Sequence, residues 1–227
     1  MPDVDAVAVN KFQSFPCEYS TTTTNYFPDL TYEFGRVGVI GDGSCFFHSM
    51  CMCMFPKYFE MSKKERQAFV MQLRCDLGAQ FTPEEHMALH TDTKYPFKMK
   101  DYEKIKSSWC DLKSWADESI IRFFSKKFKL NILFIDFNSK DASFYCGVHG
   151  DESIEDTSPT SHWNNLPLVM VAWIKSSHFE PICMKDTDNQ CYRFYFDPLD
   201  PNPKVRETNR KIIESIKSKY MCQCKIN

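Results

Sequence analysis

The residues of this sequence best suited to chemistry are one cysteine, one histidine and the carboxylates near them. Four of the seven glycines lie just before Cys45, at Gly35, Gly38, Gly41 and Gly43. Glycine is needed where the backbone takes a positive φ or approaches another group closely. A glycine-rich turn before a cysteine at a helix start lowers the thiol pKa and offers N–H groups to an oxyanion. Cys45 is therefore a candidate nucleophile, although a buried cysteine that only packs remains an alternative.

A cysteine nucleophile needs a general base, usually a histidine that a polar partner holds in place. Among the six histidines, His178 follows an apolar, strand-like segment and is followed two residues later by Glu180. A purely structural histidine is an open alternative. His86 and His90 have the spacing of a zinc-binding helix but lack the glutamate of H-E-x-x-H, so we expect a surface pair. We expect His48 to pack inside its helix.

Hydrophobic periodicity predicts the elements that position these residues. The apolar stretch 44–55 indicates a buried helix, and Ser62 with Glu65 forms a capping box that starts another. Further helices are expected from Thr82 and from Trp115, the latter with an apolar face made of Ile120, Ile121, Phe124 and Phe128. Strands are expected at 131–137 and 166–174, and a hairpin from strands at 181–184 and 191–196.

Helices come first and strands later, which predicts an α/β (α+β) fold with a small central sheet flanked by helices. We expect three segments: an irregular N-terminal extension at 1–34, a catalytic domain at 35–200, and a C-terminal amphipathic helix at 201–227. The net charge of −2 gives no drive towards nucleic acid, and no apolar run is long enough for a membrane span. We expect a monomer.

The eleven cysteines favour reduced thiols over a disulfide scaffold, because their number is odd and no secretory signal is recognised. We expect Cys51, Cys53, Cys75, Cys110 and Cys146 to be buried core residues. This predicts a cytoplasmic protein. The bias towards Phe, Lys, Asn and Ile suits a virus or an intracellular microbe.

Three stretches together resemble the ovarian-tumour (OTU) family of deubiquitinating cysteine peptidases. Gly41-Asp-Gly-Ser-Cys-Phe-Phe-His48 resembles the D-G-N-C-L-F-R nucleophile motif, and His178-Phe-Glu180 resembles the distal H-[YF]-[DN] motif. Between them, Ser114-Trp-Ala-Asp-Glu118 with the strand from Asn131 looks like the family's W-G-D/E-x-x-E helix and following strand. The motifs occur in the family's order and span residues 35–185.

The resemblance implies a role for each matching residue. Cys45 would be the nucleophile, His178 the general base and acid, and Glu180 the third member of the triad. Asp42 matches the motif aspartate, whose loop shapes the oxyanion hole and which in some members orients the histidine. The oxyanion hole would use the backbone N–H groups of Asp42, Gly43, Ser44 and Cys45. The reaction implied is hydrolysis of the isopeptide bond between ubiquitin and a lysine through a thioester, with no metal or cofactor.

Two positions depart from the family pattern. Ser44 replaces the common asparagine, which we expect to be tolerated if this position contributes mainly backbone. Glu180 is one methylene longer than the usual Asp or Asn, so Glu180 and Asp42 both remain candidates to orient His178.

The partner implied is ubiquitin or polyubiquitin, with ubiquitin-like modifiers as an alternative. Trp173 and Phe179 are expected to form a slot for the tail glycines of ubiquitin, unless Trp173 is a core residue. Candidate acids for the tail arginines, unless they are plain surface charges, are Glu103, Asp111, Asp117 and Glu118.

Three other classes of protein compete with this interpretation. A papain-like peptidase should show C-G-[SA]-C-[WY] at the nucleophile, and Cys45 lies in Gly-Ser-Cys-Phe. A non-catalytic ubiquitin-binding module should lack the cysteine, the histidine or the carboxylate, and all three are present. A structural protein would leave the clustering of scarce glycines before one cysteine unexplained.

Overall fold

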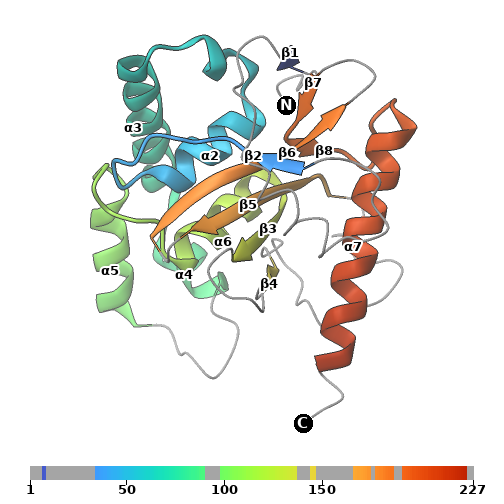
Figure 1. Ribbon diagram of the computed structural model, residues 1–227. Helices are drawn as coiled ribbons and strands as arrows, with labels where there is room; N and C mark the ends of the chain where they lie inside the picture. Colours follow the sequence, from blue (N-terminus) through green and yellow to red (C-terminus); the bar gives the residue numbers. More distant parts are fainter. Residues whose placement is uncertain are drawn as a thin grey trace.

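A mainly antiparallel sheet forms the centre of the protein in a computed structural model (Figure 1). The structure describes residues 7–8, 34–89, 98–136, 144–146, 166–174, 177–186 and 191–223. The strands are β1 Val7–Ala8, β2 Phe34–Arg36, β3 Asn131–Asp136, β4 Phe144–Cys146, β5 Leu168–Ile174, β6 His178–Asp186, β7 Cys191–Arg193 and β8 Tyr195–Phe196. Their order is β1-β7-β6-β5-β3-β4, with β2 also paired to β6 and β8 to β5.

The helices lie on both sides of this sheet (Figure 1). They are α2 Cys45–Met54, the 3₁₀ helix η2 Pro56–Glu60, α3 Lys63–Gln80, α4 Pro83–Leu89, α5 Met99–Ser108, α6 Glu118–Phe128 and α7 Pro203–Gln223. Mixed helices around a sheet confirm the α/β prediction. In the described part of the chain, none of the helices combines the length and the apolar character that crossing a bilayer requires.

Each face of the sheet has its own apolar core. On one face Phe46 and Phe47 of α2 and Phe124 of α6 pack against alternate strand residues such as Val169 and Val171. On the other face, the side chains of α7 pack against the intervening residues: Val205, Ile212 and Ile213 contact the cluster that contains Met170 and Ile182. Because β5 is covered on both faces, it is nearly continuously apolar.

Most expected elements are present, with local differences. The capping box of α3 has formed between Ser62 and Glu65. The helix expected from Trp115 begins at Glu118, because Asp117 caps it by accepting the Ile120 amide proton. Its buried face includes Phe123 in place of Ile121. α5 was not expected from the sequence.

The predicted hairpin is present with other bounds, because its first strand is longer than expected and its second strand ends at Arg193. β6 already begins at His178 and pairs with β7. β8 leaves β7 and pairs with β5, with Leu168 opposite Phe196. Of the region at 1–34, the structure describes only Val7 and Ala8 of β1 and Phe34 of β2; His90, His149 and His162 also lie outside the described residues.

Candidate active site

The turn before Cys45 is shaped by one glycine. Gly43 has a φ of +95°, and a Cβ added there would lie 2.6 Å from the carbonyl oxygen of Leu112 and 2.7 Å from that of Lys113. A side chain at this position would therefore meet both an unfavourable backbone conformation and fixed backbone atoms. The turn ends at Ser44, and Cys45 is the first residue of α2. This much of the sequence prediction agrees with the structure.

Cys45 is buried, with 4% of its surface exposed. Burial raises the pKa of its thiol above the ordinary value, although backbone hydrogen bonds from Phe179 and Phe46 act in the opposite direction. The expectation that the helix start would lower this pKa is therefore wrong, because the loss of solvation outweighs the nearby N–H groups. The resting group is a thiol that needs a base to remove its proton.

The helix of the candidate nucleophile and the strand of the candidate base are joined by Ser49. Its hydroxyl oxygen lies 2.8 Å from the carbonyl oxygen of Cys45 and 3.1 Å from that of Phe179. Phe179 directly follows His178 at the start of β6. The same hydroxyl thus contacts the main chain of both candidate catalytic segments, which fixes the first turn of α2 against the beginning of β6.

His178 lies beside the carboxylate predicted to orient it. Its Nε2 is 3.5 Å from Oε1 of Glu180, an ion-pair distance longer than a good hydrogen bond. Glu180 is 8% exposed, while His178 is half-buried and lies near Gly41, whose added Cβ would be 3.8 Å from the His178 Cε1. Among the described residues, His178 makes no hydrogen bond to the Cys45 sulfur. Catalytic hydrogen bonds are often long or absent before substrate binds.

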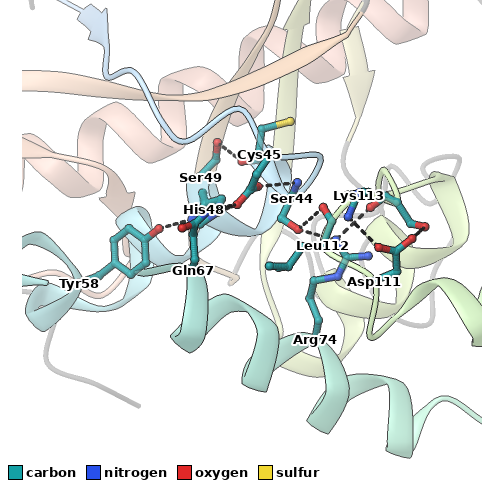
Figure 2. A network of polar contacts seen from close by, with 12 residues as sticks. Ser44, Cys45, His48, Ser49, Tyr58, Gln67, Arg74, Asp111, Leu112 and Lys113 are labelled. Atoms are coloured by element: carbon teal, nitrogen blue, oxygen red, sulfur yellow. Dashed lines mark hydrogen bonds and ion pairs between the residues drawn. The ribbon is translucent and has the colours of Figure 1, made fainter. Parts of the chain in front are cut away.

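Asp42 contacts Ser44, His48 and Gln67, which belong to the polar network around the turn before Cys45, here called the nucleophile turn (Figure 2). Its carboxylate accepts hydrogen bonds from the Ser44 amide at 3.0 Å and from the Gln67 side chain at 3.1 Å, and lies 3.2 Å from Nε2 of His48. The other ring nitrogen of His48 contacts the Tyr58 hydroxyl. The prediction that His48 packs in its helix is right about burial, but the ring is also hydrogen-bonded.

Burial dominates the electrostatics of this network. Loss of solvation lowers the pKa of His48, against the attraction of Asp42, so the imidazole is held neutral. Burial tends to raise the pKa of Asp42, but the hydrogen bonds from Gln67, Ser44 and His48 together lower it. The turn therefore rests on a charged carboxylate and a neutral imidazole at ordinary pH.

Ser44 uses its side chain as well as its backbone. Its hydroxyl donates to the carbonyl oxygen of Leu112 at 2.9 Å and accepts from Nη1 of Arg74 at 2.6 Å (Figure 2). The expectation that this position contributes mainly backbone is therefore incomplete. The hydroxyl bridges the nucleophile turn to the loop that follows α5.

Arg74 braces that loop from beneath. Its guanidinium donates to the carbonyl oxygens of Trp109, Ser108 and Ser114 at 2.7, 2.7 and 2.9 Å, and lies 4.7 Å from the ring centre of Phe47. The side chain is fully buried, and burial lowers its pKa to about 10. Two of these carbonyls, those of Ser108 and Trp109, lie at the C-terminus of α5, where a cation is favoured.

The four amides predicted for the oxyanion hole differ in their contacts. The Ser44 N–H donates to Asp42, so it is already engaged. Within the described residues, the amides of Asp42 and Gly43 donate to no other protein atom. The role of these two and of the Cys45 amide stays a prediction.

The predicted substrate residues Trp173 and Phe179 lie opposite one another on β5 and β6. Their rings are stacked, with centroids 6.2 Å apart and planes 24° apart, and both are half-buried. Phe179 also packs on Phe46 and Phe134. This places an aromatic pair next to His178. Their contact with substrate stays a prediction.

Three of the four acids proposed for the ubiquitin tail already have local partners. Asp111 accepts from the Lys113 amide and the Ser114 hydroxyl, Asp117 caps α6, and Glu118 pairs with Arg122. Glu103 is exposed on α5. The local partners favour the alternative of ordinary turn and helix contacts for the first three.

The predictions for the remaining histidine and cysteine residues have mixed outcomes. His86 is buried beside Ser119, so the expected surface pair is wrong for this residue. Cys75 and Cys110 form a disulfide and are not buried, against the expectation of reduced core thiols. Cys51 and Cys53 are buried as expected. Among the described residues, no group of three or more His, Cys, Asp or Glu is arranged to hold a metal ion.

Two arginines of this site were missed by sequence reasoning. Arg36 of β2 pairs with Glu180, which no local pattern indicates because 144 residues separate them. Arg74 had a usable signal: it is four residues after Val70 and three before Leu77, a position within the apolar stripe of α3. A charged residue there indicates a buried polar role.

Comparisons with known proteins found solved structures that resemble this one, but no related sequence. No protein-family model matches the chain, and no curated protein matches it. An ovarian-tumour (OTU) domain solved in complex with ubiquitin is 13% identical with a TM-score of 0.41, covering 83% of this chain and 90% of the other.

Two further structures complete the comparison. The viral OTU domain protease of Taggert virus is 14% identical with a TM-score of 0.45, covering 73% and 86%. An OTU deubiquitinase of Wolbachia pipientis bound to ubiquitin is 16% identical with a TM-score of 0.38, covering 66% and 94%. All three of these solved structures are described as OTU domains or OTU deubiquitinases.

Proposed function

We propose that the protein is a deubiquitinase that hydrolyses the isopeptide bond between the C-terminal glycine of ubiquitin and a lysine. The observation that carries this proposal is the joining of two motif segments at one place. Ser49 ties the main chain of Cys45 to that of Phe179, beside His178 and Glu180. The motif resemblance supports the substrate class.

The proposed reaction begins with proton transfer from Cys45 to His178. The ring nitrogen Nε2 faces Glu180, which leaves Nδ1 as the base. The thiolate attacks the carbonyl carbon, and amides of the Asp42–Cys45 turn stabilise the oxyanion. His178 then protonates the departing lysine amine. Water, activated by the same imidazole, cleaves the thioester and regenerates the thiol.

The site also suggests where the protein acts. The reaction requires a reduced Cys45, and thiols are kept reduced in the cytosol. We propose a cytosolic enzyme that works as a monomer, although the disulfide between Cys75 and Cys110 is of a kind that is rare in that compartment. A viral or microbial origin would make this a host cytosol.

Ubiquitin binding without hydrolysis is a second candidate function. It is favoured by the burial of Cys45, which is 4% exposed and whose thiol pKa is raised by that burial. In that case the protein would recognise ubiquitin but leave its conjugates intact.

A ubiquitin probe with a C-terminal electrophile tests the proposal. Wild-type protein should form a one-to-one adduct at Cys45, and Cys45→Ala should form none. Cys51→Ala, which alters another buried cysteine of α2, is the matched control and should label normally. Binding of ubiquitin without an adduct would favour the second candidate. Adducts with a ubiquitin-like modifier alone would change the substrate class.

A further inference from the structure

Glu180 contacts two groups, one at each of its carboxylate oxygens. Oε1 lies 3.5 Å from Nε2 of His178, and Oε2 pairs with Nη1 of Arg36. The side chains of Arg36 and Glu180 are 16% and 11% exposed. The pair is therefore screened less by solvent than a surface ion pair would be.

The sheet register brings these side chains together. Arg36 of β2 lies opposite Ile182 of β6, and Glu180 is two residues from Ile182 along the same strand. Residues two apart on a strand point to the same face, so Arg36 and Glu180 are diagonal neighbours. The Val37 amide donates to the Pro181 carbonyl oxygen at 3.0 Å, which fixes β2 directly beside the carboxylate.

The glycine-rich segment then passes over the same carboxylate. A Cβ added to Gly38 would lie 3.8 Å from Oε1 of Glu180. Glu180 is thus contacted by Arg36 of β2 and approached by the segment that follows β2 towards Cys45. A buried carboxylate with one oxygen held has few orientations left for its second oxygen.

We propose that Arg36 is a positioning residue that aims Glu180 at His178. A glutamate has one more rotatable bond than the aspartate or asparagine that the motif usually carries, so its carboxylate needs an additional restraint. The planar guanidinium holds Oε2 in a directional contact, which leaves Oε1 towards Nε2 of His178. Nδ1 then remains the basic nitrogen. This inference rests on the proposed function for its catalytic consequence, but not for its geometry.

The kinetic test is a double-mutant cycle with ubiquitin-amidomethylcoumarin. Arg36→Gln should lower kcat by roughly 10-fold with KM little changed, because substrate contacts are untouched while the base loses its alignment. Arg36→Lys should recover part of the loss, because the charge is kept without the planar fork. In a Glu180→Ala background, Arg36→Gln should change kcat by less than about 2-fold.

Arg193→Gln is the matched control. Arg193 pairs with Asp200, both 15% exposed, and lies opposite Met184, six residues along β6 from His178. The Arg193→Gln variant should lower the urea midpoint of unfolding as much as Arg36→Gln does, while leaving kcat unchanged. An equal fall in kcat for Arg36→Gln with and without Glu180 would overturn the proposal.

A second readout needs neither ubiquitin nor activity. The ¹⁵N shifts of the His178 ring report which nitrogen carries the proton. Wild type should favour the Nε2–H tautomer, and Arg36→Gln should shift the ring towards the mixture found in Glu180→Ala. If the tautomer responds but wild type cleaves no ubiquitin substrate, the proposed function fails and this inference stands. If wild type is active and Arg36→Gln changes neither kcat nor tautomer, the inference fails alone.

Discussion

Asp42 contacts His48 of α2, with its Oδ2 3.2 Å from the ring Nε2. The same carboxylate accepts from Ser44 and Gln67, so its oxygens are committed to the turn and to α2 and α3. Glu180 is the carboxylate beside His178. Of the two candidate orienters predicted from the sequence, the geometry favours Glu180 for the imidazole and Asp42 for the shape of the turn.

Replacing each of the two carboxylates by alanine should therefore affect a different quantity: kcat for Glu180 and the free energy of unfolding for Asp42. Glu180→Ala should lower kcat by roughly 10- to 10³-fold with little change in KM, because the imidazole loses its orienting partner. Asp42→Ala should lower the free energy of unfolding, because the Ser44 amide, Gln67 and His48 lose the carboxylate that they contact. Kinetics and urea unfolding of both single variants and the double variant measure this. A severe kinetic effect of Asp42→Ala with unchanged stability would contradict the division of roles.

The buried imidazole of His48 should make stability depend on pH. Its pKa is lowered in the fold by burial, so between pH 6.5 and the folded pKa the unfolded state binds more protons. Its contribution to stability is then complete above about pH 6.5 and is lost as the pH falls below that value.

Urea unfolding between pH 5 and 8 in wild type and His48→Asn measures the contribution of His48 to the pH dependence of stability. The variant is expected to be less stable overall, because Tyr58 and Asp42 lose a partner, but to lose less stability on acidification. Two parallel pH curves would show that His48 does not contribute.

Gly43 and Gly41 should respond differently to alanine. Gly43→Ala should destabilise by roughly 1–3 kcal/mol, because of its positive φ and the carbonyl oxygens of Leu112 and Lys113. Gly41→Ala is the matched control: its Cβ would lie at an ordinary 3.8 Å from His178. We expect it to change stability by less than about 1 kcal/mol. Equal losses in urea unfolding would argue against the steric account.

The contact between Ser44 and Arg74 should appear as coupling in stability. Ser44→Ala leaves the Leu112 carbonyl without its donor and Arg74 without one acceptor, and should cost about 1–3 kcal/mol. Arg74→Lys cannot reproduce four directed hydrogen bonds and should cost at least as much.

A double-mutant cycle in urea should therefore give a coupling energy of about 0.5–3 kcal/mol between these substitutions. Arg122→Lys, in an exposed pair with Glu118, is the control and should change stability by less than about 1 kcal/mol. Additive losses from Ser44→Ala and Arg74→Lys would show that the bridge has no role in holding the turn.

Patterns within short stretches of the sequence correctly predicted where two helices, α2 and α3, begin. The capping box at Ser62 and Glu65 and the helix beginning at Cys45 depend on residues adjacent in sequence, so they were correctly predicted. α5 was missed because only Ile105 of this helix is fully buried, which is too weak a pattern to recognise.

Long-range relationships could not be predicted in the same way. The pairing of Arg36 with Glu180 depends on the register of β2 against β6, and that register follows from the folded sheet. The raised pKa of Cys45 likewise depends on burial by residues from several elements. Motif matching named the candidate reacting groups and the candidate orienters Glu180 and Asp42, but not Arg36 or Arg74, which contact Glu180 and Ser44.

The brace under the nucleophile turn acts almost entirely on main-chain atoms. Arg74 binds the carbonyl oxygens of Ser108, Trp109 and Ser114, and Ser44 binds that of Leu112. Every residue type supplies a carbonyl oxygen, so the outward side chains of this loop, such as exposed Lys113 and Trp115, are decoupled from the brace. The side chains on the outer surface of this loop can thus change without mutational cost to the turn behind it.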